Sequence, residues 1–220
     1  MRVPRGALVV SAQARGDNPL RGPGFMVAMA RAAEAGGAGA IRAEGVADIA
    51  AIREAVKLPL VGLIKRDDEG FPVYITPDFA AAAAVAAAGA EVIAIDATAR
   101  ARKGGEVGPM IARIHAELGR EVLADVATLE EGIAAEAAGA DAVATTLAGY
   151  TGGKVPEEPD FALLAALAER CRVPVVAEGR FWWPEEVARA FALGAHAVCV
   201  GTAITDPRAI TRRFVAALPR

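Results

Sequence analysis

The sequence has little of what several classes of protein depend on. Aromatic residues make up only 5% of its 220 residues, and it contains two histidines and two cysteines. The 24 basic residues are outnumbered by 27 acidic ones, so the formal net charge is -3 and the basic excess typical of nucleic-acid-binding proteins is missing. Because Cys171 and Cys199 fit neither a disulfide framework nor a paired zinc motif, we interpret them as small apolar fillers of a reduced protein.

Neither a membrane span nor a secretory signal is indicated. The alanine run from Ala80 to Ala90 is too short and too weakly apolar to cross a bilayer, and the N-terminal segment MRVPRGALVVSAQ turns polar too early for a signal. Hydrophobic residues make up 54% of the chain, which is enough to bury a large core. We therefore expect a soluble, cytoplasmic protein with no membrane or nucleic-acid partner.

An internal repeat predicts the fold. Four segments share a helical stretch that ends at Gly-Ala and is followed by an apolar strand. Their glycines are Gly37, Gly89, Gly139 and Gly194, separated by 52, 50 and 55 residues. Glycine suits the end of a helix because it adopts the left-handed backbone conformation without steric cost.

A second series of apolar strands, GALVVSAQ, LPLVGLIK, REVLADV and VPVVAEG, alternates with the first. Helices are expected at Pro23–Ala35, Val46–Val56, Asp78–Ala88, Val107–Leu118, Leu129–Ala138, Phe161–Arg170, Pro184–Leu193 and Arg208–Ala217. Such alternation requires a parallel sheet covered by helices, so we expect residues 1–220 to form one α/β domain, an eight-stranded (β/α)8 TIM barrel. The alternative is an open doubly wound sheet, but SAQARGDNP after the first strand lacks its glycine-rich fingerprint.

Polar residues or glycine follow each predicted strand. In such a barrel the carboxyl ends of the strands meet at one mouth, where functional residues gather. The residues expected there are Ser11, Gln13, Arg42, Lys65, Asp96, Asp125, Thr145, Thr146, Glu178, Gly201 and Thr202. A single one could merely mark the exit of a strand into a polar loop, but this many in register, with both signs of charge, favour a ligand site.

Lys65 is the most informative of these residues. The chain has four lysines against 20 arginines, so a lysine at the end of a buried strand points to a property that arginine lacks. A desolvated lysine can lose its proton, whereas arginine stays charged. Lys65 is therefore a candidate general base or Schiff-base amine; the alternative is an ion pair with Asp67 or Asp68.

Other strand ends indicate a carboxylate partner and an anion site. Glu178 follows a buried strand, where a carboxylate needs a partner or a ligand. Gly179 and Gly201 end the seventh and eighth strands, whose loops often hold a phosphate in this fold. Arg180 and Thr202 would add side-chain donors.

The two histidines do not indicate a metal site. His115 falls in a helical stretch, and His196 falls at the start of the eighth strand, at the face opposite the predicted mouth. Because no histidine is expected at a strand end, we expect the protein to bind no metal there.

Taken together, the strand-end segments resemble the N-acetylmannosamine-6-phosphate 2-epimerase family of bacterial amino-sugar and sialic acid catabolism. The matching stretches, in the family's order, are VVSAQA, GGAGAIRAEG, GLIKRD, YITP, IAIDATAR, LADVATLEEG, TTLAGYT, VVAEGRFWWPEE and ALGAHAVCVGTAIT. They run from Val9 to Thr205, so the resemblance covers nearly the whole chain. It implies a TIM-barrel N-acylglucosamine-6-phosphate 2-epimerase that needs no cofactor and interconverts N-acetylmannosamine 6-phosphate and N-acetylglucosamine 6-phosphate.

The resemblance also implies roles for single residues. Lys65, in the IKRD motif, would carry the proton at C2 of the sugar, and Glu178, in AEGR, would assist it. The matching substrate-binding residues are Gln13, Arg42 and Asp125 for the sugar and Gly179 and Gly201 for the phosphate. The resemblance also implies a homodimer, because the family tends to form one.

One departure concerns the phosphate end. The chain reads TAITDP where the family usually reads AITRP, so Asp206 stands where an arginine is expected. Arg208, two residues on, is a candidate to take over that role. The segment Gly149–Pro159, with three glycines and two prolines, is the candidate lid.

Two alternative functions stay open from the residues alone. One is another phosphosugar isomerase, or an aldolase in which Lys65 forms a Schiff base. The other is a phosphosugar-binding protein without catalysis, which the presence of both Lys65 and Glu178 disfavours.

Overall fold

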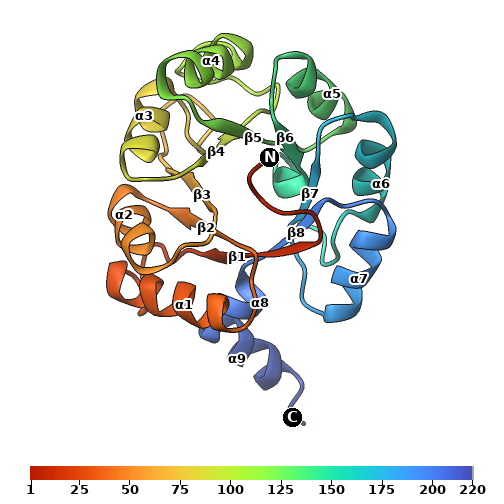
Figure 1. The fold of residues 1–220 in the computed structure, drawn as a ribbon. Helices are drawn as coiled ribbons and strands as arrows, with labels where there is room; N and C mark the ends of the chain where they lie inside the picture. The colour runs from red at the N-terminus through yellow and green to blue at the C-terminus, as the bar shows by residue number, and fades with distance from the viewer. Residues whose placement is uncertain (220) are drawn as a thin grey trace.

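The computed structural model describes residues 1–219, which form a closed barrel of eight parallel strands in the order β1-β2-β3-β4-β5-β6-β7-β8 (Figure 1). The strands are β1 (Ala7–Ala12), β2 (Ala40–Glu44), β3 (Leu60–Leu63), β4 (Val92–Asp96), β5 (Glu121–Asp125), β6 (Ala142–Ala144), β7 (Val175–Glu178) and β8 (Ala197–Val200). Pairing of β1 with β8 closes the sheet, with Val9 opposite Cys199. The prediction of a (β/α)8 TIM barrel is confirmed, and the open sheet is excluded.

Helices surround the barrel and alternate with its strands (Figure 1). They are α1 (Pro23–Ala35), α2 (Val46–Ala55), α3 (Phe79–Ala87), α4 (Val107–Arg113), α5 (Leu129–Ala137), α6 (Phe161–Arg170), α7 (Pro184–Ala192), α8 (Thr202–Thr205) and α9 (Pro207–Ala216). The four repeat glycines, Gly37, Gly89, Gly139 and Gly194, all have positive φ, between 91° and 101°. The predicted helix ends are thus confirmed.

The sequence pattern missed three short elements. The stretch predicted as one helix from Val107 to Leu118 is α4 followed by a π-helical turn, η1 (Ile114–Leu118). Thr145 and Thr146 lie in a 3-10 turn, η2 (Thr145–Leu147), directly after β6. The turn α8 separates β8 from α9 and begins at Thr202, with Gly201 as its N-cap.

Two apolar cores lie on either side of the sheet. One fills the space between strands and helices and includes Ile41, Ile49 and Ile93. The other fills the barrel interior with side chains such as Val61, Leu63 and Leu123. Successive side chains of a strand point to opposite faces of the sheet. The register of each strand therefore decides which polar residues at its end point into the barrel.

The amino ends of the strands are closed by the N-terminal segment, which crosses the middle of the barrel in Figure 1. Val3 is buried in the interior core, and its carbonyl oxygen lies 2.8 Å from Nε2 of His196. His196 therefore lies at the face opposite the carboxyl ends, as predicted. The N-terminal segment thus covers this end of the barrel interior.

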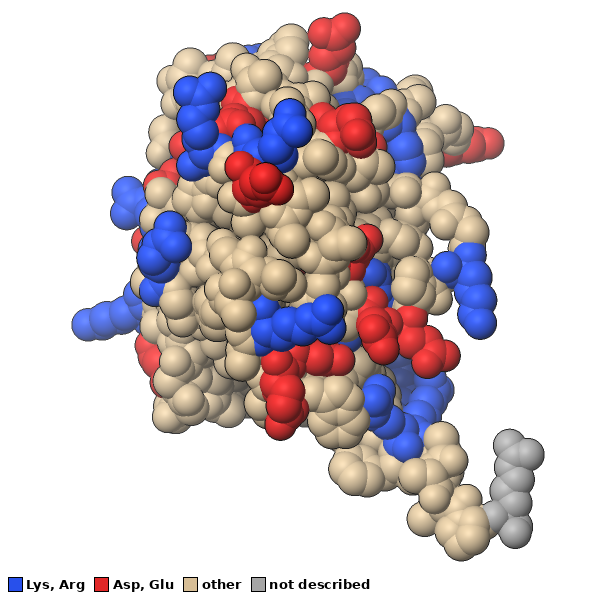
Figure 2. Space-filling view, turned by 90° about the vertical axis from the view of Figure 1, so that its right-hand side faces the viewer, with Lys and Arg blue, Asp and Glu red and all other residues tan. Residues whose placement is uncertain are grey.

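The helix α9 stands out from the body of the molecule (Figures 1 and 2). In the described part of the chain, through residue 219, α9 contributes no buried side chain, and Phe214 and Val215 are 73% and 57% exposed. No helix within residues 1–219 has the length and hydropathy that crossing a membrane requires.

Candidate active site

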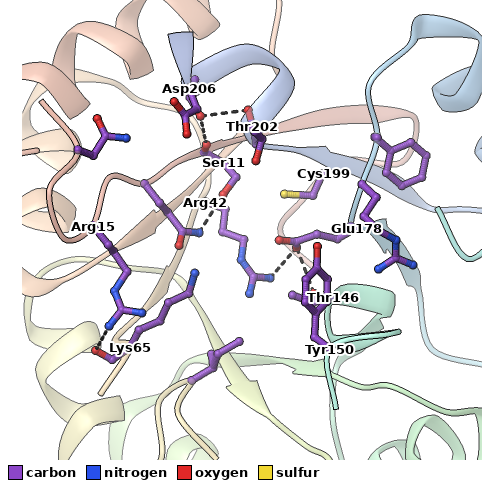
Figure 3. A pocket seen from close by; sticks show the side chains of 18 of the residues that line it. Ser11, Arg15, Arg42, Lys65, Thr146, Tyr150, Glu178, Cys199, Thr202 and Asp206 are labelled. Carbon is purple, nitrogen blue, oxygen red and sulfur yellow. Dashed lines mark hydrogen bonds and ion pairs between the residues drawn. The ribbon is translucent and has the colours of Figure 1, made fainter. Parts of the chain in front are cut away.

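A cavity of about 600 Å³ opens at the carboxyl ends of the strands (Figure 3). Its walls come from segments far apart in the sequence. The predicted residues that line it are Ser11, Gln13, Arg42, Lys65, Thr146, Glu178, Gly179, Arg180, Gly201 and Thr202. Asp125 is fully buried and accepts a hydrogen bond from Arg42, so it lies behind that side chain.

Strand register explains why these side chains meet. In β2, Ala40 is part of the interior core, so Arg42, two residues on, also points inward. The same alternation turns Asp125 inward after Leu123, and Glu178 inward after Val176. Their strands are β2, β5 and β7, so the three side chains approach one another across the barrel interior.

Arg42 is the centre of the charged groups. Its Nη1 and Nη2 donate to Oδ1 and Oδ2 of Asp125 at 3.0 and 2.6 Å, and Nη1 also forms an ion pair with Oε2 of Glu178 at 2.8 Å. Burial lowers the pKa of Arg42, but Asp125 and Glu178 outweigh it and hold the pKa above its usual value. The guanidinium is thus a fixed positive charge at the base of the cavity.

Lys65 lies beyond the end of β3, in a loop that folds back on itself. It forms a backbone bridge with Ile75, and its N–H donates to Oε1 of Glu44 at 3.2 Å. Figure 3 shows its side chain directed toward the space in front of Arg42 and Glu178. Burial lowers the pKa of Lys65 and Arg42 lowers it further, against the opposing effect of Glu178. Lys65 is therefore suited to exchange a proton.

Glu178 is held by two adjacent threonines. Thr145 Oγ1 donates to the carbonyl oxygen of Glu178 at 2.9 Å and accepts from its N–H at 3.0 Å. Thr146 Oγ1 lies 3.2 Å from Glu178 Oε2 and 2.7 Å from Asp125 Oδ1. Burial raises the pKa of Glu178, and Arg42 opposes this effect. The carboxyl is thus fixed in place, and burial makes it more readily protonated than an ordinary glutamate.

Cys199 belongs to the site, although we expected only a filler. It lies beside Glu178 in the paired strands β7 and β8, and it lines the cavity. Burial raises the pKa of its thiol, and Glu178 raises it further, so the thiol keeps its proton. Alternation along β8 could have revealed this position, because Cys199 is two residues before Gly201 and shares its inward face.

The turn after β7 orders the loop that we expected to act as a lid. Gly179 has a φ of 112° and Arg180 a φ of 63°, a conformation that is costly for a residue with a side chain. In this conformation Arg180 Nε donates to the carbonyl oxygen of Glu158 at 2.7 Å, and its Nη1 donates to that of Ala148. Arg180 lines the cavity as predicted, but it also joins the two ends of the segment from Gly149 to Pro159.

The departure at Asp206 has a structural reason. Asp206 is the N-cap of α9, and its carboxylate accepts a hydrogen bond from Ala209 N at 3.1 Å. Arg208 lines the cavity, with its Nη1 3.2 Å from Oδ1 of Asp17. The chain therefore has a guanidinium at this rim of the cavity, supplied by Arg208.

The remaining walls come from residues that the sequence analysis did not name as site residues. The lining residues beyond the predicted set include Arg15, Asn18, Tyr74, Tyr150, Trp182 and Thr205. Gln13 donates from Nε2 to Ser11 Oγ at 2.8 Å, and its Oε1 is buried without a hydrogen-bond partner. Asp96 is fully buried and turns to its own loop, where Thr98 and Arg100 bind it.

The chemistry of the cavity favours an anionic ligand over a metal. Its charged lining residues are the basic Arg15, Arg42, Lys65, Arg180 and Arg208 and the acidic Glu178 and Asp206. Such an excess of positive charge in a concave site attracts anions. Across residues 1–219, there is no group of three or more His, Cys, Asp and Glu side chains that could hold a metal ion.

Fold and site define the class: a TIM-barrel protein with a polar site for a small anionic ligand, in which a lysine faces a buried, paired arginine. The chain belongs to the NanE family, because residues 26–220 match the family described as "Putative N-acetylmannosamine-6-phosphate epimerase".

Curated relatives and a solved structure agree with this assignment. A protein of Caldanaerobacter subterraneus subsp. tengcongensis named "Putative N-acetylmannosamine-6-phosphate 2-epimerase" is 49% identical over 94% of this chain and 89% of its own. One of the same name from Thermosynechococcus vestitus is 49% identical over 97% and 94%. The structure of the N-acetylmannosamine-6-phosphate 2-epimerase from Clostridium perfringens has a TM-score of 0.95 and 46% identity, over 98% of this chain and 95% of that one.

Proposed function

We propose that this chain interconverts N-acetylmannosamine 6-phosphate and N-acetylglucosamine 6-phosphate by moving a proton at C2. The observation that carries the proposal is a lysine amine with a lowered pKa, open to a cavity of about 600 Å³ with excess positive charge. A volume of this order suits a small ligand. The names of the relatives supply the substrate pair.

Lys65 is the proposed proton carrier. The C2 proton of the sugar is acidic only when C1 is a carbonyl, so the ring opens first. The free amine of Lys65 removes the proton from C2, and the electron pair moves onto O1 to give an enediolate. Return of the proton to the opposite face of C2 completes the epimerisation. Burial and the nearby Arg42 favour the free amine that the first step requires.

Arg42 and Glu178 are proposed to stabilise the intermediate and to assist proton movement. Arg42 is a positive charge already fixed by Asp125, so it can face the developing negative charge on O1 with little reorganisation. Glu178, with its raised pKa, can supply or accept a proton during ring opening. Asp125 would act on the sugar through Arg42, because it lies behind that side chain.

The phosphate would bind at the opposite rim of the cavity. Gly179, Gly201, Thr202 and Arg180 remain our proposed donors, with Arg208 added from α9. Gln13 would contact the sugar. Binding energy from the phosphate positions C2 without changing the chemistry there.

The direct test is proton NMR of N-acetylmannosamine 6-phosphate with the protein in D₂O. We expect inversion at C2 with entry of deuterium at that carbon. Absence of turnover would contradict the proposal. Trapping of a covalent adduct by borohydride would instead support a Schiff-base aldolase, since epimerisation by a free amine forms no imine.

We also propose that the reaction needs no cofactor and takes place in the cytoplasm. Proton transfer at a carbon next to a carbonyl needs neither redox chemistry nor a group carrier, so the side chains described above suffice. Both cysteines, Cys171 and Cys199, are free, in keeping with a reducing compartment. Turnover should persist in EDTA; its loss, restored by a divalent metal, would contradict the first part.

A homodimer through α9 is the proposed assembly. An apolar groove of about 380 Å³, lined by residues that include Leu8, Val187, Val200 and Ile204, lies beside α8. The exposed Phe214 and Val215 of α9 supply a matching apolar surface. Two copies related by a two-fold axis would bury both surfaces at once, with α9 of each copy against the groove of the other.

A further inference from the structure

Thr146 shares its hydroxyl group between two carboxyl groups, those of Asp125 and of Glu178, the latter labelled in Figure 3. Its Oγ1 is 2.7 Å from Asp125 Oδ1 and 3.2 Å from Glu178 Oε2. A hydroxyl has one hydrogen, so it can donate along only one of these two contacts. If both carboxyls were ionised, the other contact would place lone pair against lone pair.

The hydrogen of Thr146 belongs to the contact with Asp125. That contact is the shorter one, and Asp125 also accepts hydrogen bonds from both terminal nitrogens of Arg42, at 3.0 and 2.6 Å, in the bidentate geometry of a carboxylate. A hydrogen bond from O–H to an ionised acceptor is the short and strong kind. The hydroxyl oxygen then presents a lone pair to Glu178, which makes this contact a hydrogen bond only when Glu178 carries the proton.

The charges around Glu178 agree with this placement. Arg42 carries one positive charge and pairs with both carboxyl groups, so ionising Asp125 and Glu178 together leaves a net negative charge unless Lys65 is protonated. The other groups that face the pair are the thiol of Cys199, Arg15 and Glu44. Lys65 and Glu178 can therefore share one proton, and a group that favours the proton on Glu178 favours the free amine on Lys65.

We propose that Thr146 is a positioning residue that holds a proton on Glu178 and so leaves Lys65 free to act as the base. Thr146 does this as a hydrogen-bond acceptor, in a chain that runs from the Glu178 carboxyl through the Thr146 hydroxyl to the Asp125 carboxylate. The inference deepens the proposed function and rests on it for the role of Lys65.

The test is Thr146→Val, which keeps the size of the side chain and removes the oxygen. Without the acceptor, Glu178 ionises more readily, and its negative charge raises the pKa of Lys65. In ¹³C NMR of the protein labelled at glutamate carboxyls, the titration of Glu178 should move to lower pH by about half to one unit, the size expected for one hydrogen bond. The rising limb of kcat/KM against pH should move the opposite way, to higher pH.

Thr146→Ser is the matched control, because it restores the oxygen and should return both titrations to the wild-type positions. Equal unfolding midpoints in urea for the two variants would exclude a general loss of structure. A shift of Glu178 to higher pH in Thr146→Val, or no shift, would overturn the inference, since the hydroxyl would then donate to Glu178 or not matter. The carboxyl titration needs no substrate, so it decides this point separately from the epimerase activity.

Discussion

Replacing Lys65 with arginine would remove the one property that the proposed chemistry requires, which is the ability to lose a proton. Arginine keeps the charge and most of the reach, but it does not give up its proton at neutral pH. We expect Lys65→Arg to be nearly as damaging as Lys65→Ala, with kcat lower by about 10²–10⁴-fold in both. Steady-state kinetics would show KM changing less, because the proposed phosphate site does not involve this residue.

The pH dependence of the wild type follows from the same group. Because the base must be unprotonated, activity should rise with pH through a pKa below that of an ordinary lysine. The Lys65→Arg prediction would be contradicted if this variant kept more than about a tenth of the wild-type kcat. Another group would then carry the proton, and Lys65 would only bind the substrate.

At the scale of residues, the sequence predicts those site residues whose side chains are unusual at the end of a buried strand. Lys65 stood out in an arginine-rich chain, and Glu178 stood out after an apolar strand. Cys199 did not, because a small apolar residue in a strand needs no special explanation. The position of Asp125 behind Arg42 depends on distances across the barrel. The spacing of the strands along the sequence does not define these distances.

At the scale of single elements, the start of α5 offers a clean test of local stability. Thr128 Oγ1 accepts from Glu131 N at 3.3 Å, and Glu131 Oε2 accepts from Thr128 N at 3.2 Å, which together form a capping box. Thr128→Ala should lower the free energy of unfolding by about 1 kcal/mol in urea denaturation. Thr128→Ser should restore it, and kcat should be unchanged in both; a neutral Thr128→Ala would show that the cap adds nothing.

The loop from Gly149 to Pro159 depends on one side chain. Arg180→Ala removes the donors to the carbonyl oxygens of Ala148 and Glu158. We expect faster amide hydrogen exchange within the loop and a KM raised roughly 10- to 100-fold, as for the loss of charged hydrogen bonds. Arg180→Lys keeps the charge but lacks the two guanidinium donors that reach both carbonyl oxygens. Equal amide hydrogen exchange in Arg180→Lys and the wild type would therefore argue against the role of these paired donors.

Elements with a strong local signal were predictable, and those without one were not. The four repeat glycines fixed helix ends because their backbone conformation excludes most other residues. The turns η2 and α8 are too short for a periodic pattern, and η1 directly continues α4, so the pattern does not separate the two.

At the scale of the whole molecule, the exposed face of α9 predicts the assembly. Phe214→Glu places a charge in the proposed interface, and it should convert a dimer to a monomer at the same concentration in sedimentation equilibrium. Ile133→Glu on α5 is the control, because Ile133 is also an exposed apolar side chain, at 38%, but lies outside α9 and the groove. A dimer that survives Phe214→Glu, or a monomeric wild type, would contradict the proposal.

The ion pairs of Arg42 with Asp125 and Glu178 inside the barrel also affect how the chain folds. Arg42, Asp125 and Glu178 come from β2, β5 and β7, so no half of the chain contains all three. A half-barrel would lose the ion pairs of Arg42 with Asp125 and Glu178 and would expose the interior core to water. Unfolding should therefore be a single cooperative event. In urea, the fluorescence of Trp182 and Trp183 and the circular dichroism of the helices should change at one midpoint, whereas two midpoints would mean that the halves are separable.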